Sequence, residues 1–512
     1  MTHIPKQLSP LTAQTGKTCC FVLMGIVALF GLGALMLAVR FAVDSPVDFE
    51  DMEDHFKYGS TGGEREAGFP FWIWKAIPQV CDDKLPGGKQ YPGQALKAFG
   101  FIYEGDRALP IGMSKRRHMG VDRVFLNCAV CHTSTVRDSP NSPPTIYTGM
   151  PANTVDLMAF EKFLFNCAKD EKFSSNFIIP EIQRLGGDLG LLDRYVVYPI
   201  AISLARERLL MLADRFQFML EQPEWGPGRV DTFGSAKAMF NFFPNRPVPE
   251  QEQVGVADFP SIWLQGPRQG MQLHWDGNNT LVEERNRSAA FGTGATPPTL
   301  DRERIKRIEK WLLTKEPPAY PYSIDQTLAA KGKPLYRRYC ADCHGVDGRH
   351  FEGPKVGRVT PIEIIRTDPH RLDSYTYAVS VNQNLLYAGY GEERFSHFRK
   401  TFGYANMPLD GVWLRAPYLH NGSVPTLRDL LEPGENRPKT FYRGNDVYDP
   451  IKVGFESTLA EVNGNSYFEF KTVDAGGNPI PGNSNLGHEG EAYGTTLPTQ
   501  DKEALVEYLK TF

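Results

Sequence analysis

The sequence predicts a mainly α-helical chain in which one N-terminal transmembrane helix precedes two domains with long loops. The first observation behind this prediction is an uncharged apolar run over residues 19–39. The second is a set of segments in which apolar residues recur at three- and four-residue steps, the period of an amphipathic helix. The third is a pentapeptide that occurs once in each half of the remaining chain, while neither half shows strong strand alternation.

The repeated pentapeptide is Cys-x-x-Cys-His, the attachment signature of a c-type haem. Its two copies read Cys128-Ala-Val-Cys131-His132 and Cys340-Ala-Asp-Cys343-His344. Two thiols at this spacing form thioethers with the haem vinyl groups, and the histidine that follows ligates the iron. A redox dithiol or half a zinc site would share the cysteine spacing, but neither explains the histidine after both copies. We therefore expect two covalently bound haem c groups, with His132 and His344 as iron ligands, in two cytochrome c-like haem domains.

The N-terminal apolar run is long enough to span a bilayer. Lys6 and Lys17 precede it, whereas six acidic residues follow it before residue 55. The positive-inside rule then predicts a cytoplasmic tail of residues 1–18, a transmembrane anchor at residues 19–43, and a periplasmic location for the rest. We expect a single-pass protein of the cell inner membrane. The alternative is a cleaved signal peptide, with Ala34 or Ala38 as the small residue near the cleavage site.

The rest of the chain divides at changes in composition. Residues 44–95 are acidic and then rich in glycine and aromatic residues, and we expect them to connect the anchor to a first haem domain at residues 96–322. That domain ends in residues 315–322, whose prolines predict a stiff linker. The second haem domain follows at residues 323–512. A net charge of −4, with no basic stretch that contains interleaved aromatics, argues against a nucleic-acid partner.

Four helices are predicted from the periodicity of apolar residues, at residues 154–169, 191–221, 325–340 and 500–510. Pro334 marks a helix start or a kink within the third of these. We expect Cys19 and Cys20 to pack within the apolar run. Cys81 and Cys167 lie in the exported part, where an oxidising compartment permits a disulfide, but the sequence leaves open whether they meet.

The sixth coordination position of each iron decides between electron transfer and catalysis. Histidine or methionine there gives a low-spin electron carrier, whereas an open position admits peroxide or dioxygen. For the second haem, Met407 is a candidate because it follows Cys343 by 64 residues, a spacing that suits a small cytochrome c domain. For the first haem, His118 and His274 are candidates, but the arginines beside His118 suggest a solvated loop. We therefore favour a five-coordinate first haem.

Two longer segments resemble bacterial di-haem cytochrome c peroxidases. They are Leu273-His-Trp-Asp-Gly-Asn278, with residues 259–263 ahead of it, and Arg415-Ala-Pro-Tyr-Leu-His-Asn-Gly-Ser-Val-Pro-Thr-Leu-Arg-Asp-Leu-Leu431. Within that superfamily, residues 228–234, 273–279 and 487–488 look most like the di-haem rubber-oxygenase branch. Both haem motifs fall in the matching order, so the resemblance covers residues 96–512.

This resemblance implies roles for three residues outside the haem motifs. Trp275 would lie between the two haems and relay electrons, with a purely structural buried tryptophan as the alternative. His488 would be the distal ligand of the second haem, with Met407 as the alternative. His420 would support the second haem pocket by hydrogen bonding.

The sequence departs from the peroxidase pattern at the distal glutamate, which those enzymes place about twenty residues after the inter-haem tryptophan to move protons. The matching stretch, residues 289–295, contains no acid. Glu283 and Glu284 come too early, and we expect them to face solvent. An apolar pocket would then favour dioxygen over peroxide. Candidate lining residues for such a pocket are Phe240, Phe242 and Phe243.

The sequence therefore predicts a membrane-anchored di-haem oxidoreductase. The first haem would react with peroxide or dioxygen, and the second would exchange electrons with it through Trp275. The expected partners are the inner membrane and a redox partner protein or small-molecule oxidant. The alternative is an electron-transfer cytochrome in which both irons have six ligands.

Overall fold

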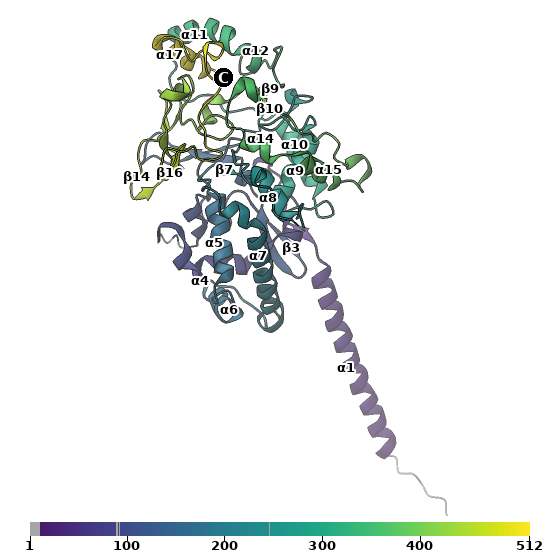
Figure 1. Ribbon diagram of the computed structural model, residues 1–512. Helices are drawn as coiled ribbons and strands as arrows, with labels where there is room; N and C mark the ends of the chain where they lie inside the picture. Colours follow the sequence, from purple (N-terminus) through teal and green to yellow (C-terminus); the bar gives the residue numbers. More distant parts are fainter. Residues whose placement is uncertain (1–10, 89–90, 92, 245) are drawn as a thin grey trace, which may run out of the picture.

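The computed structural model describes residues 11–88, 91, 93–244 and 246–512, with the side chains of residues 11–20 and 22 excepted. A long helix, α1 (Leu11–Ala42), projects from a large body formed by the rest of the chain (Figure 1). Within the described residues, Leu23–Ala42 is the one stretch of helix long and apolar enough to cross a membrane, and none of it is buried against the body. Such a helix serves as a membrane anchor or as a signal sequence. Residues 1–10 of the predicted tail and the side chains of Cys19 and Cys20 lie outside the described residues.

The C-terminal end of α1 is attached to the body through Arg40. The guanidinium of Arg40 forms an ion pair with Asp193 and donates a hydrogen bond to the carbonyl oxygen of Gly120 at 3.0 Å. Gly120 has a φ of +75°, and a Cβ there would lie 2.9 Å from the ring of Phe41. The end of α1 therefore has a fixed position relative to the body.

Residues 44–95 contribute the two edge strands of the largest sheet. This antiparallel sheet has the order β1 (Ser45–Pro46), β3 (Met113–His118), β4 (Val121–Leu126), β2 (Phe69–Pro70). The prediction of a solvated loop around His118 is wrong, because Arg116 is buried in β3. Its guanidinium pairs with Asp44 at 2.7 Å and with Asp301 at 2.5 Å, which offsets the cost of burying the charge.

Four helices pack beside this sheet in the lower part of the body as drawn (Figure 1). They are α4 (Phe71–Val80), α5 (Leu157–Lys169), α6 (Ser175–Arg184) and α7 (Tyr198–Leu220). The predicted helix at 154–169 is confirmed as α5. It begins at Leu157 because the carboxylate of Asp156 caps it, accepting from the backbone N–H of Ala159 at 2.9 Å. The predicted helix at 191–221 is confirmed as one helical run whose start, Asp193–Val197, is π-helical.

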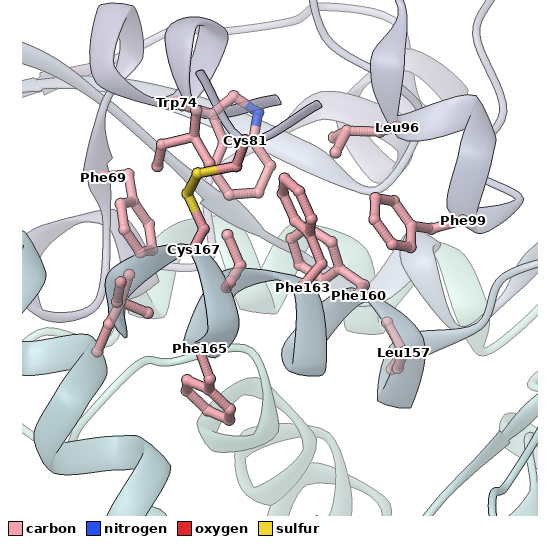
Figure 2. Close-up of a cluster of buried hydrophobic side chains, with 14 of the residues drawn as sticks. Phe69, Trp74, Cys81, Leu96, Phe99, Leu157, Phe160, Phe163, Phe165 and Cys167 are labelled. Carbon is pink, nitrogen blue, oxygen red and sulfur yellow. A yellow bond between two sulfur atoms is a disulfide. The ribbon is translucent and has the colours of Figure 1, made fainter. Parts of the chain in front are cut away.

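Cys81 and Cys167 form a disulfide, which answers the question that the sequence left open (Figure 2). The bond joins the end of α4 to the last turn of α5. Both cysteines are fully buried in the largest apolar core, among aromatic side chains that include Phe160 and Phe163.

In the second half of the chain, α11 (Gln326–Tyr339) packs against α17 (Thr499–Leu509). Both helices confirm predictions, and Pro334 lies inside α11. The two backbones approach closely at Gly332, where a Cβ would lie 1.9 Å from the carbonyl oxygen of Ala504. Residues 315–322, the predicted linker, contain no helix or strand.

The other helices and strands are short. The helices are α2 (Met52–Tyr58), α3 (Gly63–Glu66), α8 (Thr232–Met239), α9 (Val282–Gly292), α10 (Arg302–Leu312), α12 (Ala341–His344), α13 (Ile362–Ile365), α14 (His370–Ser374), α15 (Tyr377–Leu385) and α16 (Leu427–Leu430). The strand pairs, all antiparallel, are β5 (Thr133–Val136) with β6 (Thr145–Thr148), β7 (Arg229–Val230) with β8 (Ala257–Asp258), β9 (Val359–Pro361) with β10 (Gly403–Ala405), β11 (Thr440–Arg443) with β16 (Phe468–Lys471), β12 (Tyr448–Asp449) with β13 (Gly454–Phe455), and β14 (Glu461–Val462) with β15 (Asn465–Ser466). Helices account for 43% of the chain and strands for 12%, so the predominance of helix is confirmed although the strands were missed.

Candidate functional site around the two Cys-x-x-Cys-His motifs

The first motif follows strand β4 in a tight turn. The side chain of Asn127 accepts a hydrogen bond from the backbone N–H of Ala129 at 3.0 Å and donates one to the carbonyl oxygen of Gly59 at 3.0 Å. These two bonds fix the turn that presents Cys128 and Cys131. Both cysteines are free thiols, as covalent attachment of a cofactor requires.

His132 has the orientation of a metal ligand. Its Nδ1 lies 2.9 Å from the carbonyl oxygen of Pro260, and this contact assigns the proton to Nδ1 and leaves the lone pair of Nε2 free. Burial, together with the charge of Arg285, lowers the pKa of His132 to about 4. The imidazole is therefore neutral at neutral pH, in the form that ligates iron.

A cavity of about 440 Å³ adjoins the first motif, and Cys128, Cys131 and His132 line it. Its walls come mainly from α5, α7, α8 and α9 and are largely apolar. Phe240 and Phe242 line the cavity as predicted, whereas Phe243 lies against a neighbouring cluster around Tyr375 and Val379. The two thiols, the oriented imidazole and the apolar walls fit a porphyrin attached at this motif.

The second motif begins at the end of α11 and continues into α12. His344 is held in the same way as His132, because its Nδ1 lies 2.7 Å from the carbonyl oxygen of Met407. Burial lowers the pKa of His344, so this imidazole is also neutral. Cys340 and Cys343 are free thiols.

A second imidazole, that of His488, lies close to His344. Their ring centroids are 6.1 Å apart, and the ring planes are tilted by 50°. Metal–imidazole bonds of about 2 Å on both faces of a haem would place the two centroids about 6 Å apart. The separation therefore fits an iron with two axial histidines.

The backbone holds His488 in an unusual conformation. His488 has a φ of +48° and follows Gly487, whose φ is +79°. A Cβ at Gly487 would lie 2.3 Å from the carbonyl carbon of Arg366. The buried guanidinium of Arg437 donates to the carbonyl oxygens of Gly487 at 2.8 Å and His488 at 3.2 Å. Strain that is supported from several sides in this way is characteristic of functional positions.

Met407, the alternative distal ligand, occupies a different position. Its carbonyl oxygen accepts a hydrogen bond from Nδ1 of His344, whereas Nε2 is the nitrogen that would bind the iron. Met407 therefore lies on the side of the His344 ring that is opposite the iron position. Met407 lines a separate small cavity, together with Pro260. This geometry favours His488 over Met407.

Trp275 lies between the two motif regions. It is half-buried, lines the first cavity, and donates from Nε1 to the carbonyl oxygen of Asp258 at 2.8 Å. On another side it packs in a cluster with Tyr404 and Tyr493. The ring of Tyr493 lies 4.8 Å from that of His488. Trp275, which lines the first cavity, and Tyr493, which lies next to His488, thus belong to one packed cluster.

The other candidate histidines have different surroundings. His274 lines both cavities, and its Nδ1 lies 2.6 Å from Oδ1 of Asn278. His420 is buried and stacks on Tyr404 at 3.9 Å between ring centroids, and its Nε2 has no hydrogen-bond partner among the described residues. The predicted hydrogen bond from His420 to the second haem pocket stays a prediction. His118 lies in β3, 3.6 Å from Asp44.

The expectation that Glu284 faces solvent is wrong. Its side chain is buried and accepts hydrogen bonds from the backbone N–H groups of Ser396 at 2.9 Å and His397 at 3.0 Å. The ring of His397 also lies 2.8 Å from this carboxylate. The position of α9 against the 396–397 loop decides this burial, and the sequence around Glu284 does not reveal it. Glu283 is half-buried.

Four acids that were not predicted line the first cavity, namely Glu66, Glu161, Asp258 and Glu309. Glu161 lies on the cavity face of α5 among Leu157, Phe160 and Leu164, and its Oε2 has no hydrogen-bond partner among the described residues. Burial and the neighbouring Asp156 and Asp231 raise its pKa to about 8. An acid on the apolar stripe of an amphipathic helix was the signal that could have identified it.

Three arginines surround the smaller cavity of about 40 Å³ between the motif regions. Arg268 and Arg415 share the carboxylate of Asp410, at 2.5 Å and 2.7 Å. Arg285 lines both cavities, and burial together with the charge of Arg268 lowers its pKa to about 10. Three guanidinium groups line this region, and two of them share one carboxylate, so it is suited to further anionic groups.

Comparisons with known proteins found a family match in the second half of the chain and relatives of similar sequence. Residues 403–442, which include Met407 and His420, match a family described as "RoxA-like, cytochrome c-like". The chain is 26% identical to "Uncharacterized protein y4iJ" of Sinorhizobium fredii (strain NBRC 101917 / NGR234). The aligned region covers 96% of this chain and 98% of that protein. It is 32% identical to "Uncharacterized protein y4iM" of the same strain over 39% of the chain and 49% of that protein.

The family match supports the relationship to rubber-oxygenase-like cytochromes, while membership of the wider di-haem peroxidase superfamily stays a prediction. The chain therefore contains a RoxA-like cytochrome c segment and has the character of a haem redox protein.

Proposed function

We propose that this protein is a membrane-anchored di-haem c-type cytochrome with peroxide or dioxygen chemistry at the first haem and electron transfer at the second. The observation that carries the proposal is the contrast between the two sites. The ring of His344 lies 6.1 Å from that of His488 between centroids, whereas among the described residues no such ring pair is found for His132. An iron on His132 would keep an open position inside the apolar cavity.

The protein's own groups would bind and orient the cofactors. The four motif cysteines would form the thioethers, and the carbonyl oxygens of Pro260 and Met407 would hold the imidazoles of His132 and His344 in the ligating orientation. Arg268, Arg285 and Arg415 would hold the haem propionates, which supply carboxylates to a region with excess positive charge. When bound, the haems supply the redox chemistry.

Trp275 would couple the two sites. It lines the first cavity and packs in the cluster that contains Tyr493, which contacts His488. In this proposal Trp275 would serve as the relay between the two sites. The apolar walls would exclude water from the first site, which strengthens electrostatic interactions there.

The N-terminal helix would anchor the protein. We propose that α1 spans the inner membrane, with the tail in the cytoplasm and the body in the periplasm. The apolar, unburied stretch Leu23–Ala42 and the attachment of Arg40 to the body support this arrangement.

A second candidate function is electron transfer alone, with both irons six-coordinate. One observation favours it. His274 lines the first cavity, and its contact to Asn278 through Nδ1 leaves Nε2 free to bind a metal.

Haem stoichiometry tests the proposal. The pyridine haemochrome spectrum of the matured full-length protein should give two haem c groups per chain. The paired variants C128S/C131S and C340S/C343S should each retain one.

Cyanide should shift the Soret band of the C340S/C343S variant, which retains the open site. A wild-type protein with one haem, or with none, would contradict the di-haem assignment. A variant that retains only the first haem and ignores cyanide would favour the electron-transfer alternative.

A further inference from the structure

An unusual set of exposed apolar side chains begins where α1 meets the body. We call it the α7 apolar stripe, and it comprises Leu191, Tyr195, Val196, Ile200 and Leu204. From Val196 onward its members are four residues apart, so they lie on one side of the helix. Leu191 is 79% exposed and Leu204 is 60% exposed. Contiguous exposed apolar surface of this kind marks an interaction site.

The start of the stripe lies next to the end of the proposed membrane anchor. Asp193, which comes between Leu191 and Tyr195 in the sequence, pairs with Arg40 of α1. Arg40 also donates a hydrogen bond to the carbonyl oxygen of Gly120. The residue before Gly120, Met119, is itself 60% exposed. Figure 1 shows the body end of α1 beside β3, with α7 next to it. The apolar side chains nearest this junction therefore continue the apolar surface of α1.

The residue types at this junction suit a membrane interface. The guanidinium of Arg194 lies 5.4 Å from the ring centroid of Tyr195, which is 65% exposed. Tyrosine and arginine side chains of this kind sit at headgroup level, with the ring toward the acyl chains and the charge toward water.

The other end of the stripe lies at the rim of the first cavity. Arg208 comes one turn after Leu204 and pairs with Glu66 at 3.4 Å. Both residues line the cavity, yet their side chains are 42% and 48% exposed, so the cavity reaches the surface at this ion pair. Leu209, Leu212 and Phe216, on the adjoining side of α7, line the cavity wall. One helix thus carries apolar side chains from the anchor to the cavity mouth and then into the cavity.

We propose that the anchor end of the α7 apolar stripe lies in the bilayer that α1 spans, and that the first cavity receives apolar molecules dissolved in that bilayer. This inference rests on the proposed anchor and on the proposed open first haem. An apolar molecule that moves from the acyl chains along the stripe to the mouth at Arg208 and Glu66 stays in contact with apolar surface for most of the route. A water-soluble molecule gains nothing from such a surface.

Photolabelling from the lipid tests the membrane contact. The full-length holoprotein in vesicles that contain a lipid with a diazirine on its acyl chain is irradiated, and labelled peptides are identified by mass spectrometry. We expect label in α1 and in residues 191–200. Helix α15 is the internal control, since Tyr377, Val381 and Leu385 are 66%, 56% and 60% exposed and α15 lies in the upper part of the body, away from α1 (Figure 1). Label in α1 but not in residues 191–200, or label in α15 instead, would overturn the inference and leave the anchor intact. No label in α1 would contradict the anchor itself.

Binding kinetics test the route. A long-chain alkyl isocyanide is an apolar ligand of ferrous haem, and its binding rate in vesicles is followed by the Soret shift. We expect the variant I200E/L204E to bind it several-fold more slowly than wild type, and the matched variant V381E/L385E to bind it at the wild-type rate.

Cyanide, which reaches the ferric haem from water, is the control ligand. Its binding should be unchanged in both variants, which shows that the first site is intact. Equal isocyanide rates in wild type and I200E/L204E, with cyanide binding retained, would overturn the route. Failure of cyanide to bind wild type would contradict the open first haem.

Discussion

Two residues compete for one role at the second site, and their backbone positions separate them. Met407 contributes its carbonyl oxygen to the orientation of His344, whereas His488 faces His344 at 6.1 Å between ring centroids. Sequence spacing suggested Met407, whereas the family resemblance implied His488. Spacing measures distance along the chain and carries no information about which atom of a residue points to the haem.

Substitutions at these two positions should therefore have different effects. H488A should remove an axial ligand and convert the second haem to a high-spin form. H488M should restore a low-spin spectrum and raise the reduction potential, because methionine is the weaker donor to ferric iron. M407L keeps the carbonyl oxygen and should leave the visible spectrum unchanged. Optical spectra of the three variants check this, and loss of the low-spin signal in M407L would contradict it.

Glu161 should make the stability of the protein depend on pH. Its pKa of about 8 lies above the ordinary value of 4.5, so the folded protein retains a proton that the unfolded chain releases. The free energy of unfolding should accordingly fall as the pH rises from about 5 to about 8, with a slope of at most about 1.4 kcal/mol per pH unit from this group. E161Q should remove the part of the pH dependence of the free energy of unfolding that Glu161 causes. Urea denaturation of the holoprotein at several pH values measures it, with E171Q at an exposed position as the control. The same slope in wild type and E161Q would contradict the assignment.

At the scale of helices and strands, the sequence was informative where local periodicity decides the structure. Helices α5, α7, α11 and α17 have apolar stripes and were predicted within a few residues. Strand β3 was missed because Arg116 reads as a surface residue, and only its distant partners Asp44 and Asp301 make its burial possible. The burial of Glu284 was missed for the same reason. Long-range ion pairs and caps are not visible in local patterns.

The disulfide between Cys81 and Cys167 should stabilise the packing of α4 against α5. It closes a loop with a sequence separation of 86 residues, so its removal should cost about 2–5 kcal/mol. C81S/C167S should show a lower urea midpoint with an unchanged Soret band, since the thioethers of the haems are not disulfides. Added dithiothreitol should lower the wild-type midpoint to that of the variant. A midpoint in C81S/C167S equal to that of wild type would contradict this prediction.

The loop that presents His488 should tolerate little change. In G487A the new Cβ would lie 2.3 Å from the carbonyl carbon of Arg366, and the positive φ would be strained as well. We expect G487A to displace His488 and to reduce the low-spin signal of the second haem. At Gly389 nothing lies within 4 Å of an added Cβ, so G389A should leave the spectrum unchanged. The same spectrum in G487A as in wild type would contradict this account of the loop.

For the whole molecule, the sequence predicted two haem motifs but could not relate them in space. Distant ion pairs and hydrogen bonds make that connection. Arg443 pairs with Asp258 at 2.6 Å, and the carbonyl oxygen of Asp258 accepts from Trp275. The roles that the family resemblance implies for Trp275 and His488 stay predictions, and spacing along the chain alone does not suggest them, because a resemblance carries information about the whole fold.

In the proposed function the two irons differ in coordination, one open and one with two histidines. Quantitative electron paramagnetic resonance of the resting, fully matured protein, before and after cyanide, distinguishes them. We expect one high-spin and one low-spin ferric haem per chain, with only the high-spin signal converted by cyanide. Two low-spin haems that do not respond to cyanide would contradict it.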